Sequence, residues 1–209
     1  TNAVDLARIA EINPAPKELL NLGDISYTGT FNGLLTDFIT NAEIGTDAGN
    51  ITAHLHYTLL PNQNAAYTGE ISSTNLDLDM LLGLANLGPA IFDLSLNGSG
   101  LTLETLKSKV EGTISQFTFG GYRYQNMQVN GNVSNSLFNG TFDIVDPNFN
   151  FNFNGTLDAS KQTPEIAVKA NVFGINLRLL DLDNIDNFVK FTGDINLAGD
   201  NLDNLNGTV

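Results

Sequence analysis

Apolar and polar residues alternate along most of the chain. The stretches 138–144 and 149–157 are the clearest, with Phe, Ile or Leu (or Gly) at every second position and mostly Asn, Thr or Asp between them. Successive side chains of a β-strand point to opposite faces, so this period of two is typical of strands with one apolar and one polar face. The pattern predicts a mostly β protein.

A short cassette recurs in these stretches: an apolar residue, any residue, Gly, any residue, an apolar residue. It occurs at 27–31, 67–71, 110–114, 129–133, 138–142, 153–157, 191–195 and 205–209. Four of its glycines, Gly29, Gly69, Gly112 and Gly155, are about 40 residues apart, which indicates internal repetition.

The cassette at Asn139-Gly140 has two interpretations. Asn-Gly between apolar residues is a strong hairpin signal, but a two-residue turn there pairs Phe138 with Thr141 and breaks the alternation. A strand that runs straight through keeps Phe138, Gly140 and Phe142 on one face. We therefore favour mid-strand glycines, which mark bends or close approaches, over a series of hairpins. Many strands bending in this way predict a curved sheet.

The order of the segments predicts an up-and-down antiparallel meander. We expect a short helical lead-in over 1–23 and a curved β region over 24–209, with a short helical insertion at about 75–87, a helical turn at 102–106 and a short helix at 175–182. Gly120-Gly121 predicts a two-residue hairpin loop, and phase slips near Gln116 and Asn126 predict bulges. The predicted strands are 24–33, 36–45, 50–60, 65–74, 91–98, two on either side of Gly120-Gly121, 137–145, 149–159, 166–172, 188–198 and 203–209.

About a dozen strands at ~4.8 Å spacing give a sheet roughly 55 Å long. A sheet of this size with one apolar face does not stay open and flat. We expect it to close into a barrel, stack on a second sheet or curl into a trough.

Charge and composition limit the kinds of partner that the protein can bind. The chain has 23 acidic and 9 basic residues and a net charge of −14, which argues against nucleic-acid binding because like charges repel phosphate backbones. It has no cysteine, and no apolar run approaches the length of a transmembrane helix. There is no basic-then-apolar leader at Thr1, and Val209 ends inside a cassette, so we expect an excised piece of a longer protein.

No set of residues predicts catalysis or a metal site. His54 and His56 share the polar face of one strand without a third ligand, and we interpret them as solvated. The segment 181–187 lacks the glycine and glutamate of a calcium loop, and 200–204 is interpreted as a polar turn in the same way. The Asn-x-Ser/Thr triplets at Asn50, Asn97, Asn132, Asn139, Asn154 and Asn206 follow from composition. We therefore expect that the protein is not an enzyme.

The apolar face is the remaining candidate site. Two interpretations stay open: the packed core of a sandwich or barrel, or a face left open to long apolar ligands. The residues assigned to it are Phe31, Leu55, Tyr57, Ile71, Ile114, Phe117, Phe119, Val133, Phe138, Phe142, Ile144, Phe149, Phe151, Phe153, Leu157 and Phe191.

The order of several motifs resembles one family. The segments 76–83, 96–100, 110–114 and 121–126, followed by 138–142 and 146–148, are similar in order and spacing to TamB proteins of the AsmA-like superfamily, Bacteroidota type. Upstream, 29–33, 37–38, 46–49 and 67–69 fit the same order, so the resemblance covers nearly the whole chain.

That resemblance implies a fold and a function. Members are long envelope proteins, anchored in the inner membrane of Gram-negative bacteria and crossing the periplasm, with a β-rich body curled into a taco-like trough with an apolar interior. They are implicated in moving phospholipids towards the outer membrane and, with the barrel partner TamA, in assembling β-barrel proteins. The resemblance implies that this chain is a middle or C-terminal segment whose apolar face is a lipid groove. It implies no cofactor other than a bound phospholipid or fatty acid, and contact with the TamA-like partner through regions outside this chain.

Two further hypotheses stay open, and the client named in the second is what the resemblance implies. A structural or adhesive β-module would bind a protein or glycan on its Asn- and Thr-rich face. A strand-accepting chaperone for outer-membrane β-barrel proteins would take an incoming strand at an open sheet edge. Open edges would also allow dimers induced by truncation.

Overall fold

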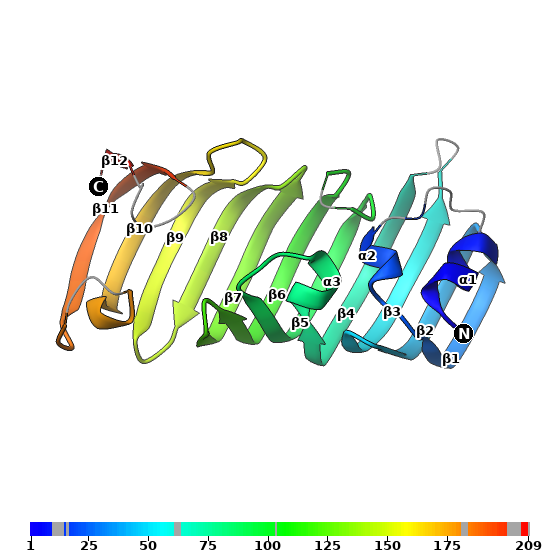
Figure 1. Ribbon diagram of the computed structural model, residues 1–209. Coiled ribbons are helices and arrows are strands. Elements are labelled where there is room, and N and C mark those ends of the chain that lie inside the picture. The colour runs from blue at the N-terminus through cyan, green and yellow to red at the C-terminus, as the bar shows by residue number, and fades with distance from the viewer. Residues whose placement is uncertain are drawn as a thin grey trace.

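The alternating segments form strands that each pair with their neighbours in the sequence. A computed structural model describes residues 1–9, 15, 17–60, 64–102, 104–180, 184–199 and 206–208. Within them, one 12-stranded antiparallel sheet has the order β1 to β12 without a crossover (Figure 1). The strands are β1 (Ser26–Leu34), β2 (Asp37–Thr46), β3 (Gly49–Leu59), β4 (Ala65–Asp77), β5 (Leu87–Ser99), β6 (Lys107–Phe119), β7 (Tyr122–Ser134), β8 (Leu137–Val145), β9 (Phe149–Asp158), β10 (Glu165–Asn176), β11 (Phe188–Ala198) and β12 (Asn206–Thr208).

Tight turns explain why neighbours in sequence are neighbours in the sheet. Gly120 and Gly121, with φ of 57° and 80°, connect β6 to β7, which confirms the predicted two-residue hairpin loop. Asn135 and Ser136, with φ of 51° and 64°, connect β7 to β8. Positive φ at both central residues gives a turn whose twist matches that of the flanking strands.

The cassette glycines lie inside strands. Asn139 and Gly140 are in the middle of β8, so the hairpin alternative is wrong. Gly69, Gly112 and Gly155 have φ of 141°, 149° and 155°. Their even spacing does not mark a structural repeat, because they belong to β4, β6 and β9, which are separated by different numbers of strands.

Irregular strand pairing keeps the apolar residues on one face at the points where the apolar–polar alternation shifts by one residue. The β5–β6 register shifts between Ile91 and Phe92, which face Gln116 and Ile114, and Asn126 on β7 has a φ of 51°. The shift confirms the predicted bulge near Gln116. At Asn126 the β6–β7 register is unbroken and the positive φ is the irregularity, so the bulge there stays a prediction. A further shift in the β4–β5 register lies between Ser73 and Leu76.

The described helices are few and short, as predicted. The lead-in contains α1 (Ala3–Ile9) and α2 (Lys17–Leu20), and the insertion contains only α3 (Leu78–Leu82), because β4 continues to Asp77 beyond its irregularity and β5 already begins at Leu87. The Asp77 side chain accepts a hydrogen bond from the Met80 N–H and caps α3, and Gly83, with a φ of 65°, ends it.

Of two further predicted helical segments, the first is a single hydrogen-bonded turn and the second is corrected by the structure. Around Thr102 there is a hydrogen-bonded turn, in which Leu106 N–H donates to Thr102 C=O at 2.8 Å, and Leu103 lies outside the described residues. The predicted helix over 175–182 is wrong at its start, because Ile175 and Asn176 extend β10; only the 3₁₀ turn η1 (Leu177–Leu180) follows, and Asp181 lies outside the described residues.

The described sheet is a single layer that does not close into a barrel. β1 pairs only with β2, and β12 pairs only with β11. The accessible surface of 12174 Å² exceeds the about 9,400 Å² expected for a compact monomer of 22.4 kDa. In Figure 1 the helices α1, α2 and α3 lie on one side of the sheet, in front of its β1–β6 part.

Candidate ligand-binding face

The pairing registers place all residues predicted for the apolar face on one side of the sheet. Residues directly opposite each other in adjacent strands share a face. Val129, Phe142, Phe153 and Ala170 are successive partners across β7 to β10, and Phe31 in β1 connects through Thr40 to Leu55 in the same way. We call this side the apolar face and the opposite side the polar face.

The largest side chains of the apolar face gather in two clusters. The Phe153 cluster has Phe153, Val168, Ala170 and Val172 as its buried members, and the Met127 cluster has Met127, Ile144 and Phe149. Partly buried residues pack against them: Ile114, Phe117, Tyr122, Tyr124, Phe138, Phe142, Phe151, Leu157, Ile166, Ile175, Phe191 and Ile195. Every one of these residues lies on a strand between β6 and β11, so both clusters consist of one sheet's own side chains.

Aromatic contacts connect the two clusters. Phe142 and Phe153 stack with ring centroids 5.6 Å apart, and Phe151 and Phe153 stack at 6.4 Å. Phe149 meets Tyr122 edge-on at 4.9 Å. Such pairs contribute about 0.5–1.5 kcal/mol beyond the area they bury. They hold the rings in a fixed pattern along the strands.

The apolar face of β1–β5 is different. Its buried positions are small, for example Thr40, Ala42 and Ala53, while Phe31 keeps 43% of its surface exposed. Phe31 stacks on Phe38 at 4.6 Å. This part of the face carries aromatic rings without enclosing them.

Tyrosines that the prediction did not assign to the site lie on the same face. Burial raises the pKa of Tyr124, and the nearby Asp146 carboxylate raises it further. Burial also raises the pKa of Tyr67 and Tyr122, and of Tyr57, which the prediction did assign to the face. These shifts indicate partial removal of water from the phenols. The signal that could have identified Tyr122 and Tyr124 was available, since they pair with Phe119 and Phe117 across the Gly120-Gly121 hairpin.

A polar network borders the Met127 cluster where β8 turns into β9. Asp146, only 3% exposed, accepts hydrogen bonds from Tyr122 Oη at 2.6 Å, Asn148 N–H at 2.9 Å and Gln125 N–H at 3.1 Å. Asn148 also donates to Tyr122 Oη at 3.1 Å. A buried carboxylate requires such partners. The network fixes the Tyr122 ring, and sequence reasoning predicted only a turn at Asp146.

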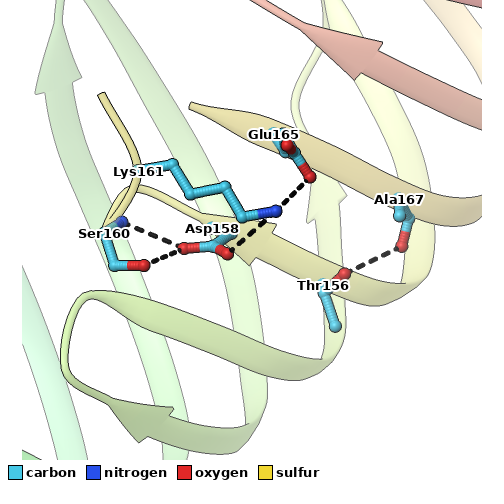
Figure 2. A network of polar contacts seen from close by, with 6 residues as sticks. All are labelled: Thr156, Asp158, Ser160, Lys161, Glu165 and Ala167. Carbon is cyan, nitrogen blue, oxygen red and sulfur yellow. Dashed lines mark hydrogen bonds and ion pairs between the residues drawn. The ribbon is translucent and has the colours of Figure 1, made fainter. Parts of the chain in front are cut away.

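The turn between β9 and β10 holds the other end of these strands. Figure 2 shows Lys161 between Asp158 and Glu165, with the Ser160 hydroxyl and N–H donating to Asp158. The Ser160 hydrogen bonds hold the pKa of Asp158 below its usual range. Hydrogen bonding to Glu165 raises the pKa of Lys161.

The polar face carries amides, hydroxyls and charges. His54 Nδ1 lies 3.1 Å from Asn41 Oδ1, and His56 Nε2 lies 2.8 Å from Asp37 Oδ1, so the two histidines have separate partners. Within the described part of the chain, no group of three or more His, Cys, Asp or Glu is placed to hold a metal ion. Asp181 to Asp183 and Asp200 to Asn204 lie outside the described residues.

Comparisons with known proteins add no assignment. No protein-family model, curated protein or solved structure matches the chain. None of the helices described here is long and apolar enough to cross a membrane.

Proposed function

We propose that the apolar face is a groove that binds the acyl chains of lipids, in a segment of a protein that carries phospholipids between the inner and outer membranes of a Gram-negative envelope. The groove is the interior of a sheet curled into a trough. The transport role, the periplasmic location, the inner-membrane anchor and the TamA-like partner come to this proposal from the resemblance to TamB proteins.

One observation carries the binding part of the proposal. Both apolar clusters are built from strands of a single sheet, and no described helix or second sheet contributes to them. Phe119, on the same face, is 48% exposed. Soluble monomers rarely expose large contiguous apolar surfaces, and those that do use them for binding.

Burial within one layer supports a curled shape. In a flat single sheet, side chains keep their outer side in water. Phe149 is nevertheless only 4% exposed, and the hydrophobic residues of its cluster all come from the same sheet. A face that bends around its own side chains accounts for this burial.

The mechanism needs no reacting group. Each methylene of an acyl chain that leaves water for the apolar face contributes about 0.8 kcal/mol. Headgroups stay hydrated at the mouth of the trough. The bound lipid then moves along a surface of similar affinity, and the direction of flow is set outside this segment.

Native mass spectrometry with lipid extraction tests the proposal. We expect the protein purified from a bacterial envelope to carry phospholipid or fatty acid in stoichiometric amounts. Phe142→Asp, Phe151→Asp and Phe119→Asp should abolish this occupancy, because each places a charge in the path of the acyl chains. Phe119 is half exposed, so its replacement should leave the fold intact.

Thr141→Asp is the matched control. Thr141 is exposed on the polar face and neighbours Phe142 in the same strand. It should change neither the fold nor lipid occupancy. Unaltered lipid in folded inner-face variants, or a clean apo protein that takes up no fluorescent lipid, would contradict the proposal.

The polar face supports a second candidate, an adhesive module. A shallow depression over β6–β8 is lined by Glu111, Thr113, Gln128, Asn130, Thr141 and Asp143, whose groups suit a glycan or a polar protein surface. Thr141→Asp would then abolish partner binding, whereas Phe119→Asp would not.

A further inference from the structure

The outer edge of β1 lacks the features that normally protect a sheet edge. All nine residues of β1, Ser26–Leu34, are exposed, and none is charged or a proline. Its pairing with β2 is regular from Ser26 to Leu34, without a bulge. Edges of natural sheets are usually blunted by charges, prolines, bulges or covering elements, because unpaired backbone groups attract another strand.

The free part of this edge has defined limits. Just before β1, Ile25 N–H donates to Thr1 C=O at 2.6 Å and Ala3 N–H donates to Gly23 C=O at 2.8 Å, so the first residues of the chain cover Gly23–Ile25 on the outer side. After Leu34 the chain turns away into β2. Among the described residues, the edge open to another strand is therefore β1 itself.

The same hydrogen bonds show which backbone groups of β1 point outward. Ile25 bonds outward to Thr1, whereas Leu22 C=O accepts from Asp47 N–H on the inner side. Backbone direction alternates along a strand, so the N–H and C=O groups of Tyr27, Gly29, Phe31 and Gly33 face outward.

Two copies of this edge fit one another. The antiparallel register that uses all nine residues is centred on Thr30. In that register Tyr27 lies opposite Gly33 of the second copy, and Phe31 lies opposite Gly29. Tyr27 contacts Thr40 and Phe31 stacks on Phe38, both on β2, so each ring keeps its contacts within its own copy while a glycine opposite it leaves room for the second strand.

We propose that β1 pairs antiparallel with β1 of a second copy of this chain, centred on Thr30. The contact forms about eight backbone hydrogen bonds and joins the two sheets with their apolar faces on the same side. It does not depend on the lipid-binding role. Each copy carries a net charge of −14, so association should strengthen as salt screens the repulsion.

Single cysteines test both the pairing and its register, because the chain has no cysteine of its own. At the two-fold centre, Thr30 faces its own copy as a non-hydrogen-bonded pair with Cα atoms about 4.5 Å apart, within disulfide reach. Thr30→Cys should therefore convert to a disulfide-linked dimer under mild oxidation, visible on a non-reducing gel. Analytical ultracentrifugation of the unmodified chain should show a dimer whose fraction increases with salt.

Thr28→Cys is the matched control on the same strand and the same face. In the proposed register its two copies are about 13 Å apart, beyond disulfide reach. Faster cross-linking of Thr28→Cys than of Thr30→Cys would overturn the register. A chain that stays monomeric at all salt concentrations, or an edge that takes up an unrelated strand peptide in preference to its own copy, would overturn the self-pairing.

Discussion

The β1–β5 and β6–β11 parts of the sheet have the same backbone arrangement but different apolar faces. In β6–β11, large residues such as Phe149, Phe153 and Met127 are buried against one another. In β1–β5 the buried positions are mostly small, such as Ala42 and Ala53, and the rings of Tyr27 and Phe31 stay nearly half exposed. Alternation alone produces the sheet in both parts. The size of the apolar side chains decides where a core forms.

Replacing an aromatic residue by alanine should give the largest difference in stability between the β1–β5 and β6–β11 parts. Phe149→Ala should lower the free energy of unfolding by about 3–5 kcal/mol, because it leaves a cavity in the Met127 cluster. Phe31→Ala should cost roughly 1 kcal/mol, since the ring is only partly buried. Urea denaturation of both variants measures the difference, and equal losses would contradict a core confined to β6–β11.

Glycine substitutions should reveal where strands approach closely. A Cβ at Gly140 would lie 2.3 Å from Asn130 O and 2.4 Å from Gly131 Cα, so Gly140→Ala should destabilise by about 1–3 kcal/mol. A Cβ at Gly193 meets nothing within 4 Å, so Gly193→Ala should be nearly neutral or slightly stabilising. Both are cassette glycines, so thermal unfolding of the pair tests packing, with the sequence context matched. Similar shifts for both would show that backbone freedom, not contact, is what the glycines provide.

Alkaline titration should show partial burial of phenols in both parts. The folded pKa of Tyr57, Tyr67, Tyr122 and Tyr124 is raised, so folding favours the neutral phenol. Their contribution to stability is complete below about pH 10 and is lost as the pH rises through the higher folded values. Absorbance at 295 nm should show tyrosines that ionise only above pH 10. The Tyr124→Phe variant should have fewer of them. Ionisation of every tyrosine near pH 10 in the folded protein would contradict the burial.

The smallest effect is expected at the turn shown in Figure 2, which belongs to the β6–β11 part but lies outside its clusters. Hydrogen bonds from Ser160 lower the folded pKa of Asp158. Their contribution to stability is therefore present above about pH 3.8, the usual pKa of such a carboxyl, and is lost as the pH falls through the lowered pKa. Ser160→Ala should return the Asp158 pKa towards that usual value in an NMR titration. The midpoint of urea unfolding at pH 7 should hardly change, and a large loss would show that the turn supports the clusters.

The alternation was sufficient to predict most strands and the mid-strand position of Gly140. Parity excludes a hairpin at Asn139-Gly140 because it would move Phe142 to the wrong face. The helix predicted over 175–182 failed for a tertiary reason: Ile175 packs with the Met127 cluster and pairs with Phe149, and this contact extends β10 past the point where the pattern ends. The β4 strand also continues beyond its predicted end, since a register shift lets Leu76 pair with Ala90.

The candidate site divides in the same way. Which residues share the apolar face was determined by the sequence, because a period of two fixes the side of the sheet for each side chain. The two clusters, the Asp146 network and the difference between β1–β5 and β6–β11 were decided by the tertiary structure. They depend on which residues lie opposite each other across strands, and register and bulges, set by turns and contacts distant in the sequence, decide that.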